Sequence, residues 1–170
     1  MRRQASDAVT ERESRLKLQS INVSELVGRC SGNSNCVRKQ VGAAILRGET
    51  LISTGCNGVA HFTDCRDAGC KWCTSDGPAG MGYDRCICTH AEQAAIGDAV
   101  RRGLSTDGAM MYISLRPCMN CVKLALTCGI DQVYYEEQWV YKDLELEEAY
   151  AILAGNFSVF KWVNAGIPPL

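Results

Sequence analysis

The sequence predicts a three-layer α/β/α sandwich around a mixed five-stranded sheet. Two short β-type runs, VGAAIL (41–46) and TLISTG (50–55), flank a tight turn that contains Gly48, which indicates a hairpin. Beyond residue 90, helical and strand-like segments alternate, as is typical of α/β folds. The chain has 170 residues, of which 46% are hydrophobic. A chain of this length buries roughly 70% of its unfolded surface as one domain.

The elements are expected in the order α-β-β-α-β-α-β-α-β. Residues 1–20 are polar, and the TERE sequence at 10–13 matches a capping box, so this segment is expected to be a polar arm or a helix. The apolar spacing within 21–28 predicts a helix that ends near Gly28. After the hairpin, residues 56–89 are aperiodic and rich in Cys, Gly and Asp; we call them the cysteine-rich insertion. A loop of this length inside a compact domain usually either has a function or is kept in place by additional interactions.

The second half of the chain alternates regularly. Helices are predicted at 90–103, 117–128 and 144–155, and strands at 109–115, 131–137 and 157–163. Pro117 is expected in the first turn of its helix, where a missing N–H costs nothing. Residues 21–170 are therefore predicted to form one domain that carries the cysteine-rich insertion.

Composition narrows the classes of function. The net charge is -1 and the basic residues are scattered, so the basic stripe typical of proteins that bind long nucleic acids is missing and a small-molecule substrate is favoured. No apolar run reaches the roughly 20 residues of a membrane span. The N-terminal residues lack the apolar core of a secretory signal, so a cytoplasmic location is expected. In a reduced compartment, eleven cysteines indicate metal binding or catalysis rather than disulfides.

Two short motifs carry the chemistry. His90 and Glu92 open one predicted helix, and Cys118 and Cys121 open another, one turn apart on the same face. Thiolates at a helix N-terminus are stabilised by unpaired N–H groups and the helix dipole. One imidazole and two thiolates leave the fourth position of a tetrahedral zinc ion open for water, as catalytic zinc sites do. Glu92 can then carry protons without binding the metal.

His-x-Glu followed by Pro-Cys-x-x-Cys is the signature of zinc nucleobase deaminases. The chain resembles the cytidine-deaminase superfamily and, within it, the deoxycytidylate (dCMP) deaminases over roughly residues 21–163. The resemblance is carried by CVRKQVGAAIL, ISTGCNG, THAEQAAI and MYISLRPCMNCVKLALTCGIDQVYY. It implies a cytidine-deaminase-like fold, zinc bound by His90, Cys118 and Cys121, and Glu92 as general acid and base.

The resemblance also implies substrate contacts. Asn57 would hydrogen-bond the substrate near the sugar, unless it is only a turn residue, and Arg38 would bind the 5′-phosphate, unless it is an exposed cation. Cys56 departs from the family, which usually has Tyr there. We expect Tyr134, Tyr135 and Tyr141 to be core or interface aromatics, although one of them could replace that ring.

Six further cysteines and His61 crowd the segment between residues 36 and 88. Some relatives carry a second, structural zinc in this insertion, and by resemblance its ligands would be Cys36 and Cys65, completed by Cys70 and Cys86. Cys73 and Cys88 are rivals for the last two positions, and six free thiols are the alternative. A structural zinc would offset the entropy of ordering such a loop. Cys30 and Cys128 are expected to be small core residues.

The implied reaction is zinc-dependent hydrolysis of dCMP to dUMP and ammonia, which feeds thymidylate synthesis. Alternatives are another small cytosine or related substrate, including 5-substituted dCMP, a guanine or a pterin-like ring; a base in tRNA or single-stranded DNA; and a catalytically silent zinc-binding subunit. The resemblance further implies a homohexamer that is activated by dCTP and inhibited by dTTP with Mg²⁺.

Overall fold

A computed structural model describes residues 22–77, 82 and 85–163; the predicted N-terminal arm lies outside them. The described part begins with α2 (Val23–Gly32), the hairpin strands β1 (Gly42–Arg47) and β2 (Thr50–Cys56), and the cysteine-rich insertion. The elements that follow are α3 (Ala91–Arg101), β3 (Met110–Leu115), α4 (Met119–Thr127), β4 (Gln132–Glu137), α5 (Leu144–Ala154) and β5 (Val159–Trp162). The predicted element order is confirmed, with boundaries shifted by one or two residues at most ends.

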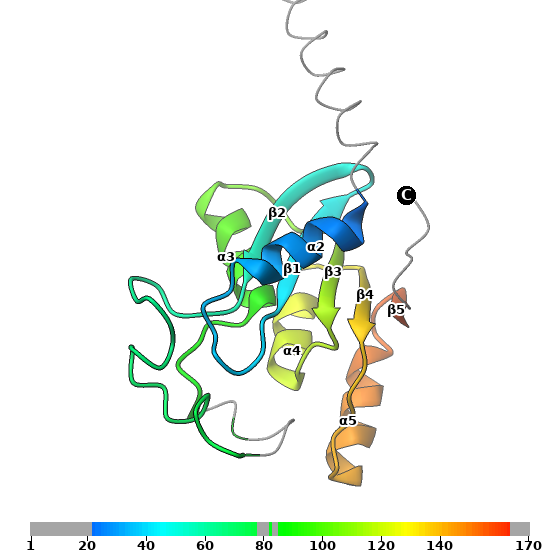
Figure 1. The fold of residues 1–170 in the computed structure, drawn as a ribbon. Helices are drawn as coiled ribbons and strands as arrows, with labels where there is room; N and C mark the ends of the chain where they lie inside the picture. Colours follow the sequence, from blue (N-terminus) through cyan, green and yellow to red (C-terminus); the bar gives the residue numbers. More distant parts are fainter. Residues whose placement is uncertain (1–21, 78–81, 83–84, 164–170) are drawn as a thin grey trace, which may run out of the picture.

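The five strands form one mixed sheet in the order β2-β1-β3-β4-β5. β1 pairs antiparallel with β2 and with β3, whereas β3, β4 and β5 run parallel. Helix α2 covers one face of the sheet, and α3, α4 and α5 cover the other (Figure 1). The three-layer sandwich is therefore confirmed. In the described part of the chain, no helix is long and apolar enough to cross a membrane.

Alternating side chains divide the core between the two faces of the sheet. In β1, Ala43 and Ile45 belong to the larger core under α3, α4 and α5, and Ala44 and Leu46 to the smaller core under α2. This period of two is the signature of a strand buried on both sides. Tyr112 of β3 follows the same rule and stacks on Tyr134 in the smaller core at a ring distance of 5.1 Å.

Two glycines let helices approach the sheet backbone closely. A Cβ at Gly42 would lie 2.2 Å from the carbonyl oxygen of Val27 in α2. A Cβ at Gly55 would lie 2.4 Å from both the carbonyl oxygen of Ala91 and the backbone nitrogen of Ala95 in α3. Only glycine can occupy these positions without displacing a helix. The first turn of α3 therefore rests directly on the main chain of β2.

Two local predictions were wrong. The first helix does not end near Gly28 but continues to Gly32, where the backbone N–H of Asn33 caps it by bonding to Cys30 and Ser31. A glycine costs a helix only about 1 kcal/mol, and burial of Val23 and Val27 against the sheet outweighs that cost. Pro117 precedes the extended N-cap residue Cys118 instead of lying in the first turn.

Candidate active site

Three possible metal ligands meet where α3 and α4 begin. His90 is the N-cap of α3, Cys118 is the N-cap of α4, and Cys121 lies in the first turn of α4. His90 Nδ1 lies 3.4 Å from the Sγ atoms of both cysteines. Tetrahedral zinc with bonds of about 2.0 Å to nitrogen and 2.3 Å to sulfur separates such ligands by about 3.5 Å. The donor set and its spacing therefore fit one zinc ion with a fourth corner open.

The electrostatics of the two thiols favour a bound cation. A hydrogen bond from Cys121 lowers the pKa of the Cys118 thiol to about 4, and the His90 side chain adds to this effect. The same hydrogen bond raises the pKa of Cys121, because Cys121 keeps the proton that it donates, and burial and the negative charges of Glu92 and Cys118 add to this rise. Only one of the two sulfurs is thus readily ionised without a metal. A bound divalent cation would offset the repulsion between the two thiolates and displace the proton of the Cys121 thiol.

Glu92 lies beside these ligands and is only 4% exposed. Burial raises its pKa from 4.5 to about 7, and the negative charge of Cys118 adds to the shift. A carboxyl group that titrates near neutral pH is suited to both accepting and donating a proton. A nearby zinc ion would lower this pKa again, since a cation favours the carboxylate. Sequence reasoning found His90, Glu92, Cys118 and Cys121, and the structure brings all four together.

Three of the four residues, His90, Glu92 and Cys118, line a cavity of about 370 Å³. The insertion and the segments that flank the sheet supply its other walls. Further residues that line it are Cys36, Arg38, Lys39, Val41, Asn57, Trp72, Cys73, Cys86, Cys88, Ala91, Leu115, Arg116, Glu137, Gln138 and Trp139. This volume is within the range of small-molecule sites, roughly 300–1,000 Å³.

Asn57 lines the cavity, but its side chain also holds the entry to β1 together. Its Oδ1 accepts hydrogen bonds from the backbone of Val41 at 2.8 Å and from the Ser34 hydroxyl at 2.6 Å. Its amide donates to the carbonyl oxygen of Lys39 at 2.7 Å. The structural role of a turn residue, which the sequence left open, is thus present. Contact between Asn57 and a substrate stays a prediction.

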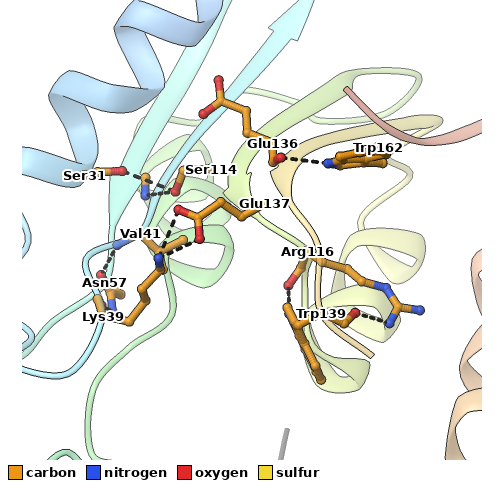
Figure 2. Close-up of polar contacts among 11 residues, drawn as sticks. Ser31, Lys39, Val41, Asn57, Ser114, Arg116, Glu136, Glu137, Trp139 and Trp162 are labelled. Carbon is orange, nitrogen blue, oxygen red and sulfur yellow. Dashed lines mark hydrogen bonds and ion pairs between the residues drawn. The ribbon is translucent and has the colours of Figure 1, made fainter. Parts of the chain in front are cut away.

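The described residues that line the cavity include the cations Arg38, Lys39 and Arg116, and the first two differ in their contacts. Arg38 donates hydrogen bonds to the carbonyl oxygens of Trp72, Ser75 and Gly77, and it lies over the Trp72 ring at 5.1 Å, so it holds part of the insertion. Lys39 forms an ion pair with the half-exposed Glu137 at 2.7 Å, as Figure 2 shows. The sequence predicts Arg38 as the phosphate contact, which stays a prediction, and no motif indicates that Lys39 lines the same cavity.

Aromatic residues and Arg116 support the start of α4. The Tyr141 hydroxyl accepts a hydrogen bond from the backbone N–H of Met119, and the Tyr150 hydroxyl donates one to the carbonyl oxygen of Pro117, each at 2.8 Å. Arg116 is 7% exposed, pairs with Glu147 at 2.6 Å and lies 4.0 Å from the centre of the Tyr150 ring. These contacts fix the helix end that carries Cys118.

The aromatic lining of the cavity comes from residues that the sequence did not single out. Trp72 belongs to the cysteine-rich insertion, and Trp139 follows β4 and exchanges two hydrogen bonds with Arg116 (Figure 2). As expected, Tyr134, Tyr135 and Tyr141 pack in the two cores. Cys56, at the end of β2, is half-buried and outside the cavity lining, and Cys128 packs against the larger core.

The predicted set for a second zinc does not form one group. Cys36 and Cys65 group with Cys73 and Cys88, whereas Cys70 and Cys86 form a second group with the same two residues. Spacing along the chain indicated a metal-binding insertion but not this division, and the two rivals belong to both groups. His61 is exposed and lies outside both.

The chain is similar to known proteins of one family. The family model of the cytidine and deoxycytidylate deaminase zinc-binding region matches residues 19–137. The deoxycytidylate deaminase of Schizosaccharomyces pombe is 33% identical over 116 residues, which cover 68% of this chain and 36% of the relative. That of Saccharomyces cerevisiae is 33% identical over 144 residues, covering 84% and 41%. The chain thus spans less than half the length of these two curated relatives.

Solved structures share the fold. The crystal structure of dCMP deaminase from the cyanophage S-TIM5 in complex with dCMP and dUMP matches with a TM-score of 0.59 and 22% identity, covering 83% of this chain and 93% of that one. At this level of identity the match concerns the fold alone.

Proposed function

Since this chain belongs to the cytidine and deoxycytidylate deaminase family, we propose that it catalyses the zinc-dependent hydrolysis of dCMP to dUMP and ammonia. One observation carries the proposal: His90, Cys118 and Cys121 converge, and His90, Cys118 and the buried carboxyl of Glu92 line a small-molecule cavity. A structural zinc site has four protein ligands and no need for a proton carrier. This arrangement has three ligands and a proton carrier.

Each side chain has a definite task. His90, Cys118 and Cys121 would hold zinc, which when bound supplies a water-derived nucleophile by lowering the pKa of water from about 16 to about 7. Glu92 accepts a proton from the attacking water and delivers it to N3 of the cytosine ring. It then transfers the second proton of that water to the departing amine. One water is consumed, the C4–N bond breaks and ammonia leaves, so atoms and charges balance.

The cavity suits a nucleoside monophosphate. Trp72 and Trp139 provide flat apolar surface for a base and a sugar, and Arg38 and Lys39 provide positive charge. Because an exposed ion pair contributes at most about 1 kcal/mol, a phosphate could displace Glu137 from Lys39 at little cost. Lys39 therefore joins Arg38 as a candidate contact for the 5′-phosphate.

A spectrophotometric assay with dCMP, dCTP, CMP and deoxycytidine tests the proposal, with zinc counted per chain. We expect loss of the cytosine absorbance with dCMP, together with release of one ammonia per dUMP, and much slower turnover of deoxycytidine. Equal rates with and without the phosphate would favour a nucleoside deaminase, and faster turnover of 5-substituted dCMP would move the assignment to that nucleotide. A zinc-loaded protein that turns over none of them would contradict the proposal.

Regulation and assembly are proposed from the resemblance only. Adding dCTP, or dTTP with Mg²⁺, to the same assay would reveal activation or inhibition. Light scattering would show whether the chain forms a hexamer. A cytoplasmic location stays a prediction.

A further inference from the structure

Six cysteine sulfurs gather beside the cavity, apart from the three catalytic ligands. Cys36 lies in the loop before β1, three of the others lie in the first part of the cysteine-rich insertion, and two lie at its end. All of them are buried except Cys86, which is partly buried, and they pack together in a cluster of their own. The six are Cys36, Cys65, Cys70, Cys73, Cys86 and Cys88.

The sulfurs form two overlapping groups of four. In each group all Sγ atoms lie within 4.8 Å of one another, and Cys73 and Cys88 belong to both. Cys73 Sγ lies 3.6 Å from Cys36, 3.5 Å from Cys86 and 3.7 Å from Cys88. Four thiolates around a tetrahedral zinc with bonds of about 2.3 Å stand about 3.8 Å apart. Each group therefore has the dimensions of one zinc site.

We propose that these residues bind a binuclear zinc–thiolate cluster in which Cys73 and Cys88 bridge the two ions. Cys36 and Cys65 complete the coordination of one ion, and Cys70 and Cys86 that of the other. A single ion on either group would leave two thiols beside it without a metal, and at least one of them is buried. Two ions with six thiolates carry a net charge of −2, the same as one zinc ion bound by four cysteines, so sharing allows a second ion without added charge.

Backbone donors around the sulfurs support thiolate character. The N–H of Val37 points to Cys65 Sγ at 3.3 Å. Backbone N–H groups of Lys39 and Arg38 hydrogen-bond Cys36, and that of Ile87 hydrogen-bonds Cys70. Donors of this kind stabilise the negative charge of metal-bound sulfur and orient the ligands.

The cluster would also shape the cavity. Three of its cysteines line the cavity close in sequence to other lining residues. Cys36 precedes Arg38 by two residues, Cys73 follows Trp72, and Cys88 precedes His90 by two residues. An insertion too polar to form its own core can be ordered by metal–thiolate bonds. Loss of the cluster is therefore expected to raise the KM of the enzyme for its substrate even where the catalytic zinc remains.

Metal counting on the full chain, purified without oxygen and desalted after incubation with zinc, tests the cluster. We expect three zinc ions per chain in the wild type, two in Cys118→Ser, which lacks a catalytic ligand, and one in Cys73→Ser, which lacks a bridge. Cys30→Ser, which changes a partly buried cysteine outside both groups, is the matched control and should keep three. Because Cys118→Ser affects only the catalytic ion, failure of the catalytic site and failure of the cluster give different counts.

Zinc X-ray absorption on the wild type gives an answer that does not depend on whether a variant folds. Bridging sulfurs 3.7 Å apart place the two ions roughly 3 Å apart, so a zinc–zinc scattering path of that length is expected. Two zinc ions per chain without this path would mean a single structural ion and would overturn the proposal. Three ions without the path, iron with inorganic sulfide, or disulfides in place of bound metal would overturn it as well.

Discussion

Glu92→Gln tests the central chemical role with the least disturbance of packing. Glu92 is 4% exposed in the first turn of α3, and glutamine fills the same space, so no cavity forms. The variant loses only the ability to carry a proton. Because general acid–base catalysis contributes about 10²–10⁴-fold, kcat for dCMP should fall by at least about 10², which is an increase of about 3 kcal/mol or more in the barrier.

Whereas kcat should fall, the free energy of unfolding of the same variant should stay the same or increase. The carboxyl ionises near pH 4.5 when unfolded and near 7 when folded, so its burial weakens the fold increasingly as the pH rises between these values. The cost is at most about 3 kcal/mol above pH 7, and bound zinc offsets part of it. The variant should therefore unfold at the same temperature as the wild type or at a higher one at pH 8.

Saturating dCMP in the absorbance assay, zinc counting and thermal unfolding provide the three measurements. Glu145→Gln, an exposed first-turn glutamate of α5, is the matched control and should behave as wild type. A Glu92→Gln enzyme with full zinc content and a kcat within tenfold of wild type would refute the role assigned to Glu92.

Three other predictions concern residues around the cavity. Lys39→Met should raise KM for dCMP about tenfold, the effect of losing about 1.4 kcal/mol of phosphate binding, and leave KM for deoxycytidine unchanged; equal effects on both substrates would exclude a phosphate contact. Glu147→Gln should cost about 2 kcal/mol of unfolding free energy, less than for a fully buried pair because Glu147 is 27% exposed. Burial acts to raise the pKa of Glu147, but hydrogen bonds from Arg116 and the Tyr141 backbone hold this pKa below its usual range. The loss of stability in Glu147→Gln should therefore be full above pH 4.5 and disappear as the pH falls through the folded-state pKa. Denaturant unfolding at several pH values checks this dependence, with Glu148→Gln as control. Asn57→Ala removes three hydrogen bonds and should cost about 3 kcal/mol, and an unchanged urea midpoint would contradict the structural role described for it.

The catalytic residues could be predicted because local rules place them. A helix begins at each motif, and ligands at helix N-termini are held by backbone geometry, so His90 and Cys118 need only the packing of α3 against α4 to meet. The strands were predictable for a similar reason, since β1 shows a continuous apolar run between turn residues. Gly28 was misjudged because tertiary burial of Val27 overrides a weak local preference.

The cavity walls were beyond sequence reasoning for a different reason. Lys39, Trp72 and Trp139 are isolated side chains without periodic neighbours, and they meet only after the insertion has folded back on the sheet. The division of the six cysteines into two overlapping groups also depends on the three-dimensional fold. Spacing along the chain shows which cysteines are near one another, but it does not show that Cys73 and Cys88 belong to both groups.

The close approach of α3 to β2 at Gly55 affects how the sequence of such a chain can change in evolution. Because the helix that begins at His90 touches main chain there and not a side chain, its height above the sheet does not depend on the size of neighbouring core residues. Substitutions in the core can accumulate through evolution while the imidazole keeps its place. A methyl group at residue 55 would displace α3 and with it the His90 imidazole. Evolution is therefore expected to retain this glycine even among relatives with little sequence identity.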